Sequence, residues 1–229
     1  MANNNTDDRF QSFAEKMQSA GMPDIAISNF KHLYEQLVEG SSGSIPESSI
    51  QAVDQLPNTE DLNLQHTETG IAALPKTVLL KLNGGLGTSM GLDKAKSLIT
   101  IRQQLNFLDI IAQHALHSNV QLLLMNSFST REDSLDALQK YPALNSTKLA
   151  LDFVQHKTPK INQHDLSPAS CVHNEQLEWH PPGHGDIYIS LSGSGMLEEL
   201  LSSGYRYALI SNADNLGAVI DTQIIGYMV

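Results

Sequence analysis

From residue 76 to the end of the chain, continuous apolar runs alternate with segments in which apolar residues recur every three or four positions. A continuous run is typical of a strand buried in a parallel sheet, and the three-to-four spacing is typical of an amphipathic helix. The runs predict strands at 77–82, 120–125, 149–155 and 207–211, and the spaced segments predict helices at 107–117, 131–140, 195–201 and 222–229. This alternation predicts right-handed crossovers and therefore an α/β sandwich with a mostly parallel sheet.

The first 75 residues are polar, and we expect them to form a helical N-terminal extension. Two predicted helices carry apolar faces, formed by Phe10, Phe13 and Met17 in the first and by Phe30, Leu33, Tyr34 and Leu37 in the second. Contact of these faces with the core of the following domain is the simplest interpretation, and a surface for a partner is the alternative. The predicted domains are thus 1–75 and 76–229, and the polar stretch 156–180 is expected to be a loop or a small excursion over the site.

Composition and charge narrow the class of protein. Hydrophobic residues make up 41% of the 229-residue chain, and no apolar run approaches the ~20 residues that a membrane-spanning helix needs. The formal net charge of −11 argues against nucleic-acid binding, because such binding depends on neutralising phosphates. The first residues do not resemble a secretory signal, and Cys171 has no second cysteine to pair with. We therefore expect a cytoplasmic protein that spans no membrane and binds no nucleic acid.

A glycine-rich segment follows the first predicted strand, with glycines at 84, 85, 87 and 91. Backbone amides in such a loop can point at an anion, and Lys96 just beyond it adds a positive charge. The segment matches neither the Walker A pattern, because Ala95 precedes Lys96, nor the dinucleotide fingerprint, because Met90 stands at the third glycine position. We interpret it as a phosphate cradle for a nucleotide, and a tight connection without a ligand is the alternative.

The acidic composition makes a metal-dependent site the expected one. A nucleoside triphosphate would bring further negative charge to a chain whose net charge is already −11. That charge has to be met locally by Lys96, by backbone amides and by a divalent cation, while Lys94 either adds charge or is merely solvated.

Three later segments join the glycine loop in one recognisable set: 124–128 (Leu-Met-Asn-Ser-Phe), 181–188 (Pro-Pro-Gly-His-Gly-Asp-Ile-Tyr) and 211–218 (Ser-Asn-Ala-Asp-Asn-Leu-Gly-Ala). In this order they resemble the UTP–glucose-1-phosphate uridylyltransferases of the eukaryotic type, from about residue 74 onward. The resemblance implies a Rossmann-like nucleotidyltransferase sandwich. It also implies Mg²⁺-dependent transfer of the uridylyl group from UTP to glucose-1-phosphate, by direct in-line attack, giving UDP-glucose and pyrophosphate.

The resemblance assigns roles to individual residues. Those implied to bind UTP are Leu82, Asn83, Gly84, Gly85, Lys96, Gln155, Gly183 and Asp214. Those implied to bind the sugar phosphate are Gly84, Gly85, His184, Asn212, Ala213 and Asp214. Lys96 and Asp214 are the implied catalytic residues, with Asp214 as the Mg²⁺ ligand. The sequence departs from the family at Lys94-Ala95, where Gly-Pro is usual, and at 156–160, where Ser-Arg-Tyr-Pro-Arg is usual.

Some of these assignments have an independent rationale. Asp214 follows a predicted strand, and ligands in open α/β sheets bind at the carboxyl ends of the strands. A glutamine amide offers both a donor and an acceptor, which suits the imide face of uracil, although a strand-end glutamine without a ligand is the alternative for Gln155. An ordinary turn is the alternative for 212–215.

The family continues beyond the position of Val229, with a second lysine near the phosphates and most of the sugar pocket. The resemblance therefore implies a catalytic domain that is incomplete at its C-terminal end and inactive alone. We expect helix 222–229 to lack a surface for its apolar side chains. A nucleotide-binding module without turnover and a pyrophosphorylase for other sugar-1-phosphates are the alternative functions.

Overall fold

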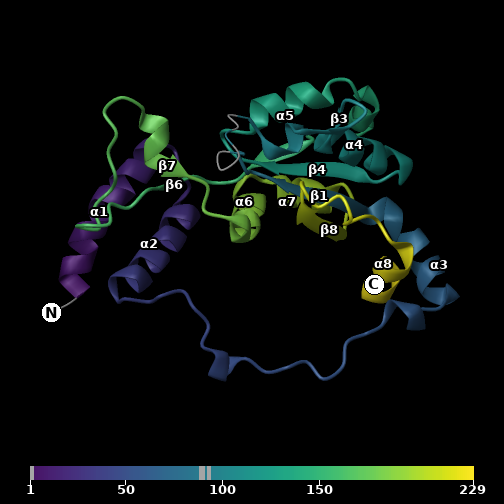
Figure 1. Ribbon diagram of the computed structural model, residues 1–229, viewed down its shortest axis with the longest axis horizontal. Helices are drawn as coiled ribbons and strands as arrows, with labels where there is room; N and C mark the ends of the chain where they lie inside the picture. Colours follow the sequence, from purple (N-terminus) through teal and green to yellow (C-terminus); the bar gives the residue numbers. More distant parts are fainter. Residues whose placement is uncertain (1–2, 88–90, 92–93) are drawn as a thin grey trace. The chain divides into compact units, whose positions relative to one another are not determined.

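The computed structural model describes residues 3–87, 91 and 94–229, so Thr88, Ser89 and Met90 of the glycine loop lie outside the described residues. The chain forms two compact units (Figure 1). Unit 1 consists of Met1–Leu56 and His156–Ile189, and unit 2 consists of Pro57–Gln155 and Ser190–Val229. This division differs from the predicted one at residue 75 because the segment 156–189 packs with the N-terminal helices.

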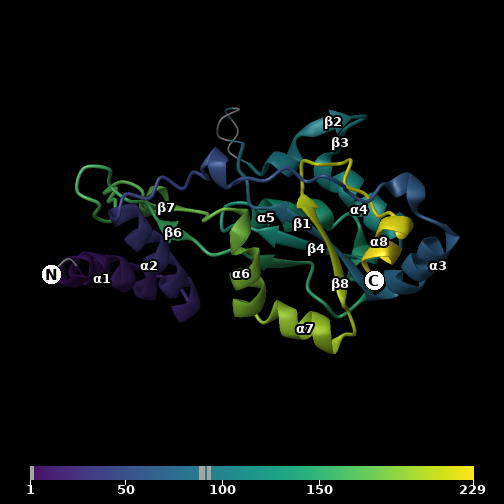
Figure 2. The same ribbon diagram turned by 90° about the horizontal axis from the view of Figure 1, so that it is seen from below.

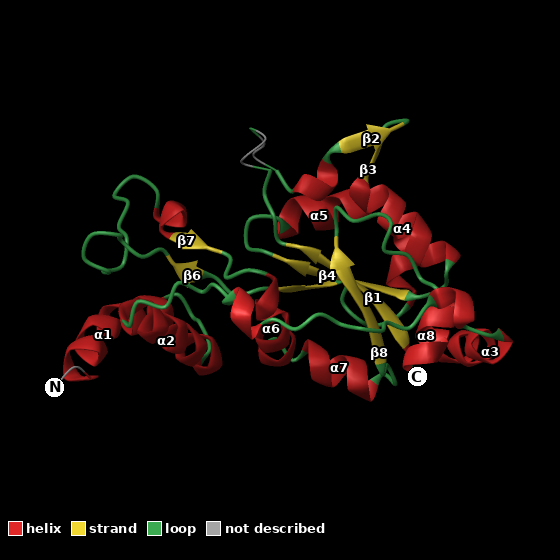
Figure 3. Cartoon of the chain, turned by 60° about the horizontal axis from the view of Figure 1, so that its bottom comes forward, coloured by secondary structure: helices red, strands yellow, loops and turns green. Residues whose placement is uncertain are grey.

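Unit 2 is built on a sheet of four parallel strands in the order β5-β4-β1-β8 (Figure 3). The strands are β1 (Thr77–Asn83), β4 (Gln121–Asn126), β5 (Asp152–Val154) and β8 (Tyr207–Asn212). The predicted α/β class with a mostly parallel sheet is confirmed. All residues of β4 and nearly all of β1 are buried, as their continuous apolar runs predicted.

Helices connect and cover these strands. They are α3 (Leu64–Ala73), α4 (Phe107–His117), α5 (Arg131–Leu138), α7 (Met196–Ser202) and α8 (Thr222–Met228), while α6 (Ile187–Gly193) contains the junction between the units. α4 and α5 cover one face of the sheet, and α7 lies on the other (Figures 1 and 3). The core between α4 and the sheet is made by Leu79, Leu108, Ile111, Ala112, Leu122 and Leu124.

The ends of α4 follow from local chemistry. Asn106 and Asp109 form a reciprocal capping box, which fixes the start of α4 at the predicted position. The preceding hairpin of β2 (Thr100–Arg102) and β3 (Leu105–Asn106), seen from below in Figure 2, was not predicted. Its turn residues, Gln103 and Gln104, have positive φ. Two-residue hairpin turns usually have glycine or asparagine at such positions, so two glutamines gave no sign of a turn.

α8 packs closely on α3 through its glycine side, while most of its apolar side chains are exposed, as expected. Glycines form the crossing: a Cβ on Gly70 would lie 1.8 Å from the carbonyl oxygen of Thr222, and one on Gly226 would lie 1.7 Å from that of His66. The other side of α8 exposes Ile224, Tyr227 and Met228.

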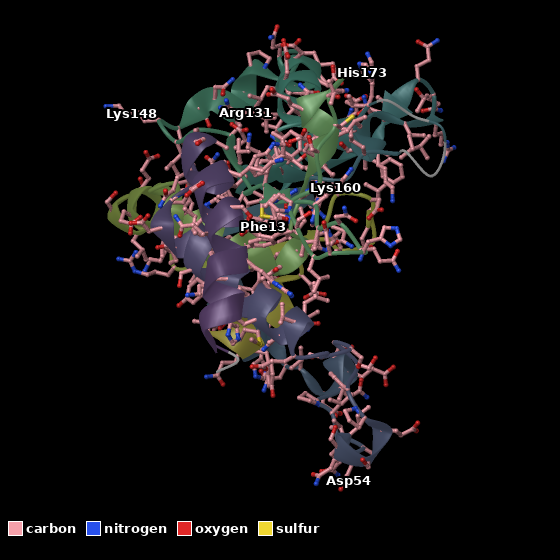
Figure 4. All side chains as sticks on the ribbon, turned by 90° about the vertical axis from the view of Figure 1, so that its left-hand side faces the viewer. Phe13, Asp54, Arg131, Lys148, Lys160 and His173 are labelled. Carbon is pink, nitrogen blue, oxygen red and sulfur yellow. The ribbon has the colours of Figure 1, made fainter. Side chains whose placement is uncertain are left out.

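Unit 1 contains α1 (Asn3–Ser19), α2 (Asp24–Val38) and a small hairpin of β6 (Thr158–Pro159) and β7 (Trp179–His180). The predicted loop 156–180 therefore contains two short strands. The predicted face of α1 is buried, but it packs within unit 1 and not against the core of the sheet, with Phe13 inside the unit (Figure 4). The core residues are Phe10, Phe13, Met17, Ile27, Phe30 and Tyr34, with Ile161, Leu166 and Trp179 packed against them.

Two positions of the α2 prediction are wrong. Leu33 is 50% exposed and Leu37 is 42% exposed, because the buried stripe of this helix runs through Ile27, Phe30 and Tyr34 instead. These three residues recur at intervals of three and four and so share the side that faces α1.

Two further features concern the surface of the chain. Residues 41–61 carry no buried side chain, and Asp54 of this segment is labelled in Figure 4. Within the described part of the chain, no helix has both the length and the apolar character required to cross a membrane.

α4 also holds the segment between β8 and α8. The backbone N–H of Ile220 donates to Nε2 of His114 over 3.3 Å, which requires a neutral imidazole. Burial lowers the pKa of His114, and the positive charge of Lys81 and the neighbouring His117 lower it further. This contact is therefore intact at neutral pH.

The close crossing of α3 and α8 predicts that Gly226→Ala destabilises unit 2. Alanine normally favours a helix over glycine by ~0.5–1 kcal/mol, but here its methyl group would collide with the His66 carbonyl. We expect a net loss of about 1–3 kcal/mol in the free energy of unfolding, the scale of overpacking, measured by urea denaturation. Gly217→Ala is the control, since its nearest contact would be 3.5 Å away. Equal stabilities of the two variants would contradict the crossing.

The His114 contact predicts a pH dependence. As pH falls below the ordinary histidine value of 6.5, the unfolded chain gains a proton at His114 before the folded chain does. The unfolded state then binds more protons, so the free energy of unfolding falls with falling pH and is restored above 6.5. His114→Gln should lose part of this slope between about pH 7.5 and 5.5. Identical slopes for wild type and His114→Gln would argue against the contact.

Candidate functional site

The glycine loop leaves the carboxyl end of β1 and returns to it. Leu86 and Ala95 form an antiparallel bridge, the N–H of Gly87 donates to the Lys94 carbonyl over 3.3 Å, and the N–H of Lys96 donates to the Gly85 carbonyl over 3.1 Å. These bonds close the loop and bring the backbone of the half-buried Lys96 beside Gly85.

Gln155 lies directly against this loop. Its backbone N–H donates to the Asn126 carbonyl over 2.8 Å, and its side chain is only 5% exposed. A Cβ on Gly84 would lie 2.0 Å from Gln155 Nε2, so any larger residue at 84 would displace the amide. The amide makes no side-chain hydrogen bond with the described residues. Gly84 and Gln155 therefore form one feature, a glycine backbone next to an amide with free donor and acceptor groups.

The side chain of Asn83 supports the loop from within the protein. Its Nδ2 donates to Asn126 Oδ1 over 2.7 Å and to Ser134 Oγ over 2.8 Å, and its Oδ1 accepts from Ser97 Oγ over 2.5 Å. Because Ser97 adjoins Lys96, the last of these bonds also fixes the lysine relative to β1. The side chain of Asn83 is thus engaged internally, which the sequence prediction of UTP binding did not foresee.

The same network continues across the sheet. Asn126 Nδ2 donates to Asp152 Oδ2 over 3.1 Å, and Arg131 Nε donates to the same oxygen over 2.8 Å. The carboxylate of Asp152 in turn raises the pKa of Arg131. Asn126, Ser134 and Asp152 were missed as site residues by the sequence analysis. For Asn126 the available signal was its place at the end of an apolar run, whereas Ser134 within α5 and Asp152 at the start of β5 had no such signal.

The segment after β8 lies beside the glycine loop. Leu82 and Asn212 are register partners, and the N–H of Ala213 donates to the Leu82 carbonyl over 3.0 Å. Ala213 is buried, whereas Asn212 and Asp214 are exposed. Unit 2 therefore gathers nine of the predicted residues at the carboxyl edge of its sheet: Leu82, Asn83, Gly84, Gly85, Lys96, Gln155, Asn212, Ala213 and Asp214.

Gly183 and His184 belong to unit 1. Gly183 has φ of +105°, a conformation that favours glycine, and a 3₁₀ turn over His184–Asp186 follows it. The Asp186 carboxylate accepts the backbone N–H of His156 over 2.7 Å and lies 3.0 Å from His156 Nδ1. His184 is exposed, and a Cβ on Gly185 would meet nothing within 4 Å. The sequence analysis predicted no role for Asp186, which anchors this turn.

The metal prediction rests on Asp214. Across the described residues, no group of three or more His, Cys, Asp or Glu side chains is arranged to hold a metal ion. His114 and His117, whose spacing is compatible with metal binding, therefore have no third ligand. An exposed carboxylate at a strand end is the donor that Mg²⁺ uses when phosphate oxygens and waters supply its other ligands.

Comparison with known proteins gives one consistent answer. Residues 27–229 match the family described as UTP–glucose-1-phosphate uridylyltransferase. The uridylyltransferase of Solanum tuberosum is 39% identical over 214 residues, covering 88% of this chain and 44% of that protein. The relative from Encephalitozoon cuniculi is 37% identical over 188 residues, covering 80% of this chain and 35% of that protein.

Solved structures agree with the sequence relatives. A mutant UDP-glucose pyrophosphorylase from Leishmania major, in complex with UDP-glucose, matches with a TM-score of 0.86 and 39% identity, over 96% of this chain and 47% of that one. A Trypanosoma brucei structure titled UDP-glucose phosphorylase matches with a TM-score of 0.88 and 40% identity, over 96% and 48%. The chain thus spans about half the length of these relatives. It belongs to the UTP–glucose-1-phosphate uridylyltransferase family.

Proposed function

We propose that the protein transfers the uridylyl group of UTP to glucose-1-phosphate, giving UDP-glucose and pyrophosphate in the presence of Mg²⁺. The observation that carries the proposal is the buried Gln155 amide against Gly84, at the carboxyl edge where Lys96 and Asp214 also lie. An amide with a free donor and a free acceptor complements the imide face of uracil, and the adjacent glycine lets the base approach the backbone closely.

In this reaction a phosphate oxygen of glucose-1-phosphate attacks the α-phosphorus of UTP. A new oxygen–phosphorus bond forms, the bond from the α-phosphorus to the oxygen shared with the β-phosphate breaks, and pyrophosphate leaves with that oxygen. No protein nucleophile is needed, so the chain contributes positioning and charge stabilisation. Lys96, held at Gly85 by its backbone hydrogen bond, supplies a fixed positive charge for the triphosphate.

The residues present fit a bound Mg²⁺. The exposed carboxylate of Asp214 would hold it, and when bound it would neutralise charge on the phosphate oxygens. Asn212, exposed two residues earlier, would donate to or accept from the sugar substrate. His184 of unit 1, which the family resemblance assigns to the sugar phosphate, has an exposed imidazole. The single cysteine, Cys171, supports a reducing compartment such as the cytoplasm.

A nucleotide-binding module without turnover is the second candidate, favoured by the chain's spanning about half the length of its relatives. Calorimetry with UTP and Mg²⁺, combined with a coupled assay for pyrophosphate release, separates the two functions. Binding with release supports uridylyl transfer, and binding without release supports the module. Comparing glucose-1-phosphate with galactose-1-phosphate in the assay tests the sugar preference. Absence of UTP binding would refute both candidates.

We expect Gln155→Leu to weaken UTP binding by about tenfold, the scale of one or two lost hydrogen bonds. The loss should be specific to the base, so the preference for UTP over CTP should disappear as well. Gln51→Leu in the exposed segment 41–61 is the matched control and should bind like wild type. An unchanged preference in Gln155→Leu would mean that the amide does not read uracil.

We expect Lys96→Ala to lower kcat/KM for UTP by roughly 10²–10³, the scale of losing one preorganised charge donor. Lys94→Ala removes the same charge two residues away and should have a small effect, since that side chain is exposed. If the chain binds UTP without turnover, the ratio of its UTP affinity to its UMP affinity is the readout. Equal behaviour of the two variants would remove Lys96 from the triphosphate site.

A further inference from the structure

A second lysine, one that neither the motifs nor the mechanism uses, lies inside unit 2. Lys81 is in the middle of β1, among leucines, and only 1% of it is exposed. Its Nζ donates to Ser211 Oγ over 2.7 Å and to the Ala218 carbonyl over 3.1 Å, and it lies 3.4 Å from the Asn215 carbonyl. Its three hydrogen-bond partners are all neutral oxygens, so within the described chain the ammonium is met by dipoles alone.

Burying an ammonium is unfavourable unless its hydrogen bonds replace water, and lysines are rarely buried. Burial accordingly lowers the pKa of Lys81. A strand with only a packing requirement could carry leucine or methionine here without that penalty. The position of the acceptors shows what the ammonium provides in return. Ser211 precedes the exposed residues Asn212 and Asp214, and Asn215 and Ala218 follow them.

The segment 212–220 is thus tied down on both sides of Asp214. The N–H of Ala213 donates to the Leu82 carbonyl. The Lys81 ammonium donates to the carbonyls of Asn215 and Ala218, and the N–H of Ile220 donates to His114. Three N–H groups of one ammonium match three acceptors that converge on it. The exposed carboxylate of Asp214 itself is left outward-facing and uninvolved in these anchors.

We propose that Lys81 is a positioning residue: its buried ammonium holds the segment 212–220, and thereby fixes Asn212 and Asp214 where they receive the substrate and Mg²⁺. The inference rests on the proposed function, because that function assigns those two residues to ligands. A rigidly held carboxylate binds its ligand without first losing conformational freedom, so the effect is on affinity.

The test compares Lys81→Met, which keeps the volume and removes the charge, with Lys76→Met, which removes an exposed charge at the other end of β1. Amide hydrogen exchange at Ala213, Asn215 and Ile220 reports on the segment directly, since each of these amides donates a hydrogen bond. Calorimetry with UDP-glucose and Mg²⁺ reports on the site. Urea denaturation reports on the fold.

We expect Lys81→Met to speed exchange at these three amides at least tenfold and to weaken UDP-glucose binding in Mg²⁺ by at least tenfold. Its denaturation midpoint should stay close to that of wild type, because removal of the buried charge offsets the loss of hydrogen bonds to acceptors on residues that are half-buried or exposed. Lys76→Met should leave all three measurements unchanged. Loss of ligand affinity at undiminished stability is a result that a merely structural lysine would not give.

Unchanged exchange at the three amides in Lys81→Met overturns the inference, as does unchanged UDP-glucose affinity when wild type binds. Should Lys81→Met fail to fold, Ser211→Ala is the second variant, because it removes one acceptor and keeps the lysine. It must then raise the rate of amide exchange at Ala213 and Asn215 about threefold. Failure of wild type to bind either UTP or UDP-glucose refutes the proposed function, and the inference with it. If wild type binds these ligands and Lys81→Met behaves as wild type does, the inference alone is refuted.

Discussion

The structure of unit 2 depends on one constraint, the need to satisfy polar groups that are buried where parallel strands end. β1 and β4 finish side by side with Asn83 and Asn126, which are register partners, and Asp152, the first residue of the neighbouring strand β5, reaches the side chain of Asn126. A buried polar group without a partner is unfavourable by about 1–3 kcal/mol, so these side chains must bond to one another. The bonds from Asn83 to Asn126 and from Asn126 to Asp152 meet that requirement.

Meeting the requirement also positions the candidate site. The hydrogen bond from Ser97 to Asn83 holds the residue next to Lys96, and Thr130 Oγ1 donates to the Asn83 carbonyl over 2.7 Å at the start of the glycine loop. The loop that we assign to phosphate binding is therefore fixed at both ends by the buried network. Because a satisfied network in a low-dielectric interior is rigid, the exposed groups above it are preorganised.

Much of the fold could be predicted because it follows from local patterns. The runs that gave β1 and β4 are buried on both faces, and the α4 prediction is matched by a capping box at Asn106. What the sequence did not reveal depends on tertiary contacts. The exposure of Leu33 follows from which stripe of α2 meets α1, and the pairing of α3 with α8 depends on two glycines far apart in the sequence, Gly70 and Gly226.

The same distinction applies to the site. Clustered glycines indicated the loop at 84–91. The structure explains the glycine at 84, because any side chain there would collide with the amide of Gln155. Single polar residues within apolar runs carried no comparable signal. Lys81 read as part of a strand and Asp186 as part of a motif, yet one anchors the segment that carries Asp214 and the other anchors the turn that carries His184.

Charge explains why such anchors matter in this protein. The chain has 14 lysines and arginines against 25 acidic residues, so positive charge that could receive a triphosphate is scarce. Placing one of these cations in the interior at Lys81, rather than at the surface, forgoes a direct contact with the ligand. That placement is consistent with selection for geometry at the site, since a buried ammonium with fixed acceptors orders the backbone around it more strongly than a solvated one. In the proposed function the direct charge comes from Lys96, whose backbone position is set by its bond to Gly85 and by the bond from Ser97 to Asn83, so that both proposed roles depend on the rigidity of the strand ends.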